Sequence, residues 1–169
     1  MVAVFFADAE GAERRARSIP LRARLLVLRR RPARAARATV AAGIRLFTRS
    51  PLIHVAVGAG DAVLNQSRRG STFIRLDVFA AYPGVRGYFL IPLDRCPDWP
   101  SFQQPDAPIQ HTRTVAAWVT RNRIRAHNCL SVTRRVLEQG GLVIPRRITS
   151  PARLHQWFME NEYEWHTLA

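Results

Sequence analysis

The sequence predicts an α+β fold, because short apolar strands fill the middle of the chain and helices follow toward its end. The chain has 169 residues, of which 47% are hydrophobic and 22% charged, which is typical of a globular domain with a sizeable core. No internal repeat is present. We expect residues 1–34 to form a basic N-terminal extension and residues 35–169 to form one compact domain.

The strand predictions rest on apolar or alternating runs that end at turn residues. Gly60 and Asp61 separate two such runs and predict a hairpin whose first strand carries His54 near its beginning. The expected strands are residues 2–6, 52–58, 63–66, 72–76 and a stretch within 85–93.

The helix predictions rest on apolar residues at helical spacing and on capping residues. The expected helices are residues 13–37 with interruptions at Pro20 and Pro32, then 35–47, 112–122, a helix from Cys129, and one from Pro151 to about residue 159. Residues 78–82 are expected to form a short turn or helix, and 94–108, with four prolines, a loop. We expect the acidic tail, 160–165, to pack on the basic surface.

Cys129 is predicted to lie in the first turn of a buried helix. Asn128 is a suitable N-cap, and Gly140 with Gly141 ends the helix. A thiol at the positive end of the helix dipole can have its pKa lowered from about 8.5 to between roughly 3.5 and 7.5. The alternative is an inert packed cysteine, because free cysteine is among the most buried residue types.

A histidine on a strand and a cysteine at a helix start are the components of a thiol–imidazole acyl-transfer site. His54 would then deprotonate Cys129, and Gln66 on the return strand would orient the imidazole. Asn65 takes that role if the register differs by one residue, since strand side chains alternate between faces. The backbone N–H of Cys129 would stabilise an oxyanion. His127 is a rival base, although its side chain leaves the helix start in a different direction from that of Cys129.

Several segments together resemble the circularly permuted branch of the NlpC-like, papain-fold cysteine peptidases, in which the histidine strand precedes the cysteine helix. The matching segments are residues 47–57, Gly60 with Asp61, Asn128 with Cys129, and 148–154, and the resemblance spans about residues 35–158. It implies a papain-like fold, in which an antiparallel sheet carries the histidine on a strand packed against the helix that begins at the cysteine.

The resemblance assigns the nucleophile to Cys129, the base to His54 and the third position to Gln66, where many relatives carry His, Glu or another polar residue. Leu52 and Ile53 depart from the aromatic residue and serine that often precede the histidine in relatives. It also implies a cysteine hydrolase acting on an amide or ester carbonyl, most directly in peptidoglycan stem peptides. Asn65 and Asn128 are the residues expected to contact substrate. Lipid acyl hydrolysis or acyl transfer is the second enzymatic alternative.

The net charge of +14 and the isoelectric point of about 11.7 predict an anionic partner. All 26 basic residues are arginine. The candidate partners are an anionic polymer such as peptidoglycan and, through the Arg-rich N-terminal region, nucleic acid or an anionic membrane. The alternative to an enzyme is a non-catalytic, Arg-rich virion or nucleic-acid-associated protein that uses the same fold as a scaffold.

Two cysteines, Cys96 and Cys129, are too few for a disulfide framework and do not suggest a zinc site. No residue pattern specifies a metal or organic cofactor. The N-terminus has no signal-peptide pattern, and no apolar run reaches the roughly 18 to 20 residues of a membrane span. We therefore expect synthesis in the cytoplasm, followed by virion association or release without a Sec signal.

Overall fold

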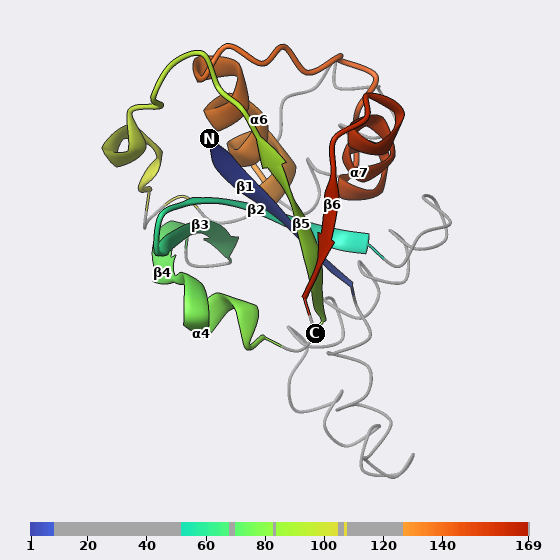
Figure 1. The fold of residues 1–169 in the computed structure, drawn as a ribbon. Coiled ribbons are helices and arrows are strands. Elements are labelled where there is room, and N and C mark those ends of the chain that lie inside the picture. The colour runs from blue at the N-terminus through green and yellow to red at the C-terminus, as the bar shows by residue number, and fades with distance from the viewer. Residues whose placement is uncertain (9–51, 68–69, 83, 105–106, 108–126, 169) are drawn as a thin grey trace, which may run out of the picture.

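The computed structural model describes residues 1–8, 52–67, 70–82, 84–104, 107 and 127–168, and in these the fold is α+β (Figure 1). A six-stranded antiparallel sheet has the order β4-β3-β2-β1-β5-β6. Its strands are β1 (Val2–Asp8), β2 (Leu52–Ala59), β3 (Ala62–Ser67), β4 (Gly70–Arg75), β5 (Val85–Ile91) and β6 (Trp165–Thr167). The helices are α4 (Leu76–Ala80), the 3₁₀ helix η1 (Trp99–Phe102), α6 (Cys129–Gln139) and α7 (Pro151–Glu160). The helices expected within 13–47 and 112–122 lie outside the described residues.

The two faces of the sheet are buried by different elements, as the alternation of side chains along a strand requires. On β1, Val4 and Phe6 belong to the larger core, which includes residues of α6 and α7. Phe5, between them, belongs to a smaller cluster with Phe79 of α4. Figure 1 shows α6 and α7 together beside the upper part of the sheet and α4 at its other end.

The first eight residues form the centre of the sheet. β1 lies between β2 and β5, and Phe6 is opposite both Val55 and Gly87. β1 thus supplies part of the domain core, and residues 9–34 of the expected N-terminal extension lie outside the described residues.

The predicted hairpin is confirmed. β2 and β3 are joined through Gly60 and Asp61, and Gly60 has a φ of 60°, a left-handed conformation that glycine adopts without steric cost. The strand expected at 72–76 is also present, although Leu76 begins α4 instead of ending β4.

The C-terminal tail pairs with the sheet. Residues 165–167 form β6 against β5, and the Trp165 ring contacts Phe6, Phe89 and His155. Gly87 permits this approach, because a Cβ there would lie 2.3 Å from the His166 carbonyl oxygen and 2.4 Å from a carbon of the Trp165 ring. The Arg-rich segments lie outside the described residues, so the expected packing of the acidic tail on a basic surface stays a prediction.

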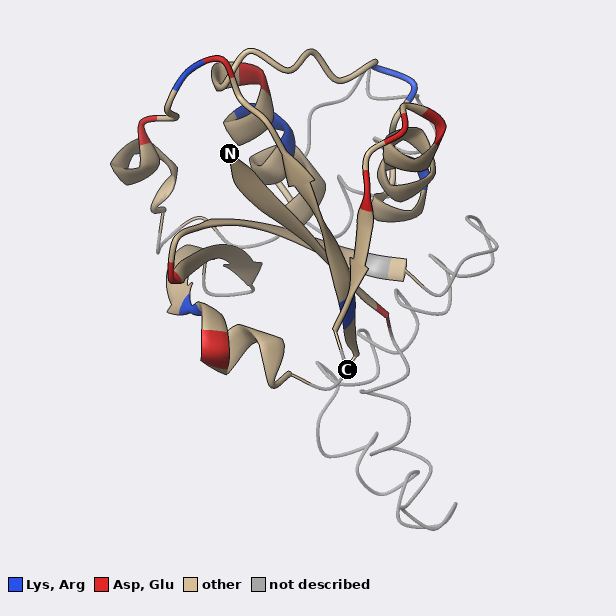
Figure 2. Ribbon diagram, in the orientation of Figure 1, with Lys and Arg blue, Asp and Glu red and all other residues tan. Residues whose placement is uncertain are grey.

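The net positive charge of the chain does not come from the described residues. Figure 2 shows both signs of charge scattered over its elements. The described residues contain eight arginines and nine acidic residues, a formal charge of −1, so the other segments carry the whole positive excess. In the described part of the chain, no helix has the length and apolar character needed to cross a membrane.

Candidate active site

Strands β2 and β3 part close to the N-terminus of α6. Their ladder has three pairs, from Ala59 opposite Ala62 to Val57 opposite Leu64, although β2 begins at Leu52 and β3 continues to Ser67. α6 packs on β2, and Cys129 is its first residue. The Val55 N–H, beyond the last ladder pair, donates a hydrogen bond to the Cys129 sulfur. The thiol therefore lies at the edge of β2 where its pairing with β3 has ended.

His54 and Cys129 lie close enough for charge and side-chain hydrogen bonding between them to shift the pKa of each. Burial by itself lowers the pKa of His54, because it disfavours the imidazolium. The charge of a Cys129 thiolate and the hydrogen bonds to Cys129 and Asn65 act in the opposite direction, and the net pKa of His54 is raised. The two sequence-predicted residues are thus brought together, and the site favours a charged imidazole.

The pKa of Cys129 shifts in the complementary direction. Burial by itself raises the thiol pKa, but the charge of His54 and its hydrogen bond lower it, as do the backbone N–H groups of Val55 and Leu130. The net pKa of Cys129 is lowered. A raised imidazole pKa beside a lowered thiol pKa favours a thiolate–imidazolium pair, the nucleophilic form of a cysteine.

Asn65 makes the orienting contact with the imidazole. Its Oδ1 lies 2.7 Å from His54 Nε2 and accepts a hydrogen bond from it. Because an amide oxygen cannot donate, Nε2 carries the hydrogen, and in the neutral ring Nδ1 is then the proton acceptor. The tautomer suits a base that takes the thiol proton at Nδ1.

Gln66, expected to orient His54, lies on the opposite face of β3. Gly58 is opposite Val63, so strand alternation places His54 and Asn65 on one face and turns Gln66 to the other. The predicted contact between Gln66 and His54 is wrong. His54 instead contacts Asn65, the alternative expected if the register differs by one residue.

The Gln66 side chain is fully buried within a different polar network. Its Nε2 donates to the backbone carbonyls of Ser67 and Ala107, at 3.1 and 2.9 Å. Its Oε1 accepts from the Ser71 hydroxyl and lies 3.1 Å from His127 Nε2. The side-chain hydrogen bond described for His127, the rival base, is thus with Gln66. Burial and, secondarily, Arg135 lower the pKa of His127, which favours its neutral form.

Asn128 is confirmed as the N-cap of α6. Its Oδ1 accepts from the Ser131 N–H at 2.8 Å, and the Ser131 hydroxyl oxygen accepts from the Asn128 N–H at 2.9 Å, which completes a capping box. The Asn128 side chain, which was expected to contact substrate, therefore accepts a hydrogen bond from a backbone N–H in the first turn of α6. This cap also fixes the first turn of α6, which carries the thiol.

Two contributors to the site were missed from the sequence. One is the Val55 N–H, which becomes available to the thiol only because β2 and β3 part. The other is Ser71, which is buried and lies opposite Gln66 in the β3–β4 ladder. The alternation of residues 72–76 predicts a strand there, and its pairing with β3 could have placed Ser71 opposite Gln66. It could not have shown which of the two side chains donates the hydrogen bond.

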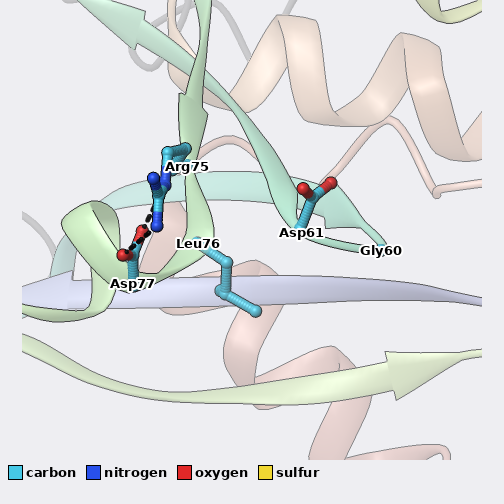
Figure 3. A pocket seen from close by; sticks show the side chains of 5 residues that line it. All are labelled: Gly60, Asp61, Arg75, Leu76 and Asp77. Carbon is cyan, nitrogen blue, oxygen red and sulfur yellow. Dashed lines mark hydrogen bonds and ion pairs between the residues drawn. The ribbon is translucent and has the colours of Figure 1, made fainter.

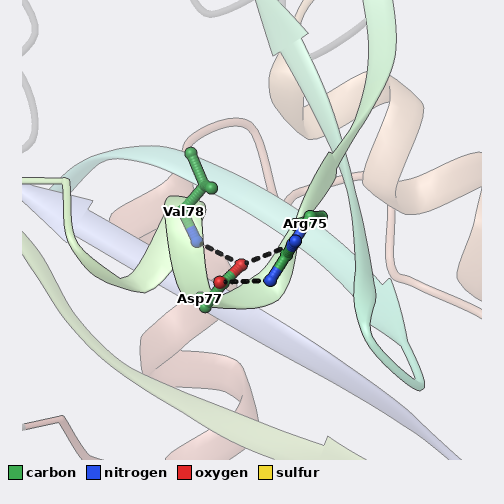
Figure 4. Close-up of polar contacts among 3 residues, drawn as sticks. All are labelled: Arg75, Asp77 and Val78. Atoms are coloured by element: carbon green, nitrogen blue, oxygen red, sulfur yellow. Dashed lines mark hydrogen bonds and ion pairs between the residues drawn. The ribbon is translucent and has the colours of Figure 1, made fainter.

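A separate hollow lies at the far end of the hairpin. It is lined by Gly60, Asp61, Arg75, Leu76 and Asp77, and Figure 3 shows Arg75 turned toward Asp77 and away from the hollow's other carboxylate. Asp77 also accepts from the Val78 N–H at 2.8 Å (Figure 4). The Arg75–Asp77 ion pair is exposed, and such pairs stabilise proteins little. Six residues of strand, roughly 20 Å, separate Gly60 from His54, so this hollow is not part of the thiol site.

Within the described ranges, no cluster of three His, Cys, Asp or Glu side chains could hold a metal ion. Comparison of the chain with protein-family models, with curated proteins and with solved structures gives no match.

Proposed function

We propose that this protein is a cysteine hydrolase of the permuted, papain-like NlpC type, which cleaves an amide or ester carbonyl. Cys129 is the nucleophile and His54 the general base, with Asn65 orienting the imidazole. The observation that carries the proposal is the shared hydrogen bond of Cys129 and His54, whose pKa values shift toward a thiolate–imidazolium pair. Such a pair makes a thiolate available near neutral pH.

The proposed reaction has two steps. In the first, the Cys129 thiolate attacks the carbonyl carbon, and the His54 imidazolium gives its proton to the departing amine or alcohol as the old bond breaks. This leaves a thioester on Cys129 and a neutral His54. In the second, His54 takes a proton from water, the resulting hydroxide adds to the thioester carbonyl, and the acid product leaves as the Cys129 thiolate is restored.

Peptidoglycan stem peptides are the proposed substrate class. The resemblance to NlpC-like peptidases favours an amide bond, and the charge of the chain favours an anionic polymer. In the sequence, Arg49, Arg68, Arg69 and Arg125 each lie within five residues of His54, Asn65 or Cys129. The segments that adjoin the site in the sequence therefore carry positive charge, which would suit an anionic substrate.

The first test is the pH dependence of iodoacetamide alkylation at Cys129, read by mass spectrometry. Cys96 is exposed and serves as the reference thiol in the same chain. We expect Cys129 to be alkylated at about pH 6 and to lose this reactivity in His54→Ala. A Cys129 that reacts no faster than Cys96 at that pH, or is unaffected by His54→Ala, would exclude an activated nucleophile.

The second test is hydrolysis of purified peptidoglycan and of ester substrates. Wild type should release new amino and carboxyl ends from the peptide stems, and Cys129→Ala and His54→Ala should not. Release of acid from lipid esters alone would transfer the proposal to the acyl-hydrolase alternative. An alkylation-competent protein that cleaves neither, and whose nucleic-acid affinity falls steeply with salt, would favour the binding protein.

A further inference from the structure

Gln66 links strand β3 to the chain segment that leads into the cysteine helix. Its side chain is 2% exposed, and all of its polar groups have partners within the protein. The amide nitrogen donates to Ser67 and Ala107, and the amide oxygen faces Ser71 and His127. A buried polar group with every partner present holds its neighbours in one arrangement, because breaking any bond leaves a buried group unsatisfied.

The contact with His127 has a defined direction. Gln66 Oε1 can only accept, so the hydrogen in the 3.1 Å contact lies on His127 Nε2. Neutral and charged imidazole can both carry a hydrogen there, so the contact survives protonation of His127. The hydrogen bond therefore acts as a tether between β3 and residue 127 in both protonation states of His127.

This tether lies two residues before the thiol. His127 precedes the N-cap Asn128, whose capping box with Ser131 fixes the first turn of α6, and Cys129 is the first helical residue. Holding the His127 ring on β3 therefore fixes where the chain enters α6, and with it the position of the sulfur.

The neighbouring residue of the same strand holds the other half of the pair. Asn65 binds the His54 imidazole from one face of β3, and Gln66 binds His127 from the opposite face. We propose that Gln66 is a positioning residue, which acts through His127 to hold Cys129 in register with His54. Two consecutive residues of β3 then set the distance between the base and the nucleophile. The inference rests on the proposed function for its effect on hydrolysis, but the alignment itself is measured on the thiol.

The test compares three variants of the full chain by the pH profile of Cys129 alkylation and by thermal unfolding. His127→Phe keeps a ring but has no N–H donor. His127→Gln places an amide donor at nearly the same reach. Ser71→Ala removes another hydrogen bond to the same Gln66 oxygen without touching residue 127, and is the control for stability alone.

We expect His127→Phe to slow alkylation at about pH 6 by roughly tenfold and to move the profile to higher pH. His127→Gln should retain the wild-type profile, and Ser71→Ala should lower the melting temperature without moving it. An unchanged profile in His127→Phe, or an equal shift in Ser71→Ala, would overturn the positioning role. If His127→Phe does not fold, His127→Asn, which is too short to reach Gln66, replaces it with the same expected result.

Failure of this inference is distinct from failure of the proposed function. If wild-type Cys129 reacts like Cys96, both are overturned, because no activated thiol exists to be aligned. If wild-type Cys129 is activated but His127→Phe reacts equally fast, only the positioning role is excluded.

Discussion

The hydrogen bond between Asn65 and His54 is the smallest unit of the site that can be tested alone. Because this bond contributes to the raised pKa of His54, its loss should lower the pKa of the imidazole and reduce the imidazolium population near pH 6. We predict that Asn65→Ala slows Cys129 alkylation at about that pH by roughly 10- to 100-fold, the range for one hydrogen bond to a charged group.

Asn65→Asp is the matched control, because a carboxylate also accepts from His54 Nε2 and should keep or extend the low-pH reactivity. Equal reactivity of Asn65→Ala and wild type across the profile would contradict an orienting role for Asn65.

At this scale, the sequence predicts residue types better than residue contacts. His54 and Cys129 could be singled out because each lies near the beginning of a recognisable element. The choice between Asn65 and Gln66 could not be made, because alternation states only that one of two neighbours faces the histidine. That choice depends on the pairing of Gly58 with Val63 and on the parting of the strands beyond Val57, which involves residues distant in sequence.

The N-caps of α6 and α7 form a natural pair for comparison at the scale of elements. Asn128 caps α6 through the Ser131 N–H, and Ser150 caps α7 through the Arg153 N–H at 3.3 Å. We predict that Asn128→Ala and Ser150→Ala each lower the free energy of unfolding by about 1 kcal/mol, measured by denaturant titration. Only Asn128→Ala should also move the pH profile of Cys129, because only α6 carries the thiol. A shift of that profile by Ser150→Ala would mean that the overall stability of the fold, and not the first turn of α6, controls the reactivity of Cys129.

Elements with strong local patterns were predicted closely, and elements formed by long-range contact were not. The hairpin and the starts of α6 and α7 have turn or capping residues that act locally, and their bounds follow. β6 was missed because three residues after an acidic run carry no strand pattern of their own, and they become a strand only through pairing with β5. The central place of β1 was likewise invisible, because its neighbours β2 and β5 come much later in the chain.

The whole domain should lose stability as the pH falls, in part through His155. The imidazole of this α7 residue packs against Phe6, Phe89 and Trp165, with ring-centroid distances of 5.2, 5.2 and 4.8 Å. Burial lowers its pKa below the unfolded value of 6.5. Above that pH the ring is neutral in both states. As the pH falls below it, the unfolded chain binds the proton first, and the free energy of unfolding decreases until the folded pKa is passed.

We predict that wild type loses more free energy of unfolding between about pH 7 and pH 5 than His155→Phe, which keeps the aromatic packing without a titrating group. His127, whose pKa is also lowered, contributes in the same direction in both proteins and cancels in the comparison. Parallel loss of stability in the two proteins would contradict this assignment.

Among the described residues, each group from another element that lowers the pKa of Cys129 belongs to β2, and β2 meets Cys129 only when α6 docks on it. The His54 imidazole and the Val55 N–H come from a strand far earlier in the chain, so an unfolded or newly synthesised molecule carries an ordinary thiol with a pKa of about 8.5. The lowered pKa of Cys129 thus depends on the folded arrangement of β2 and α6 and is lost when the protein unfolds. The alkylation rate of Cys129 at about pH 6 would therefore report the fraction of molecules that are folded.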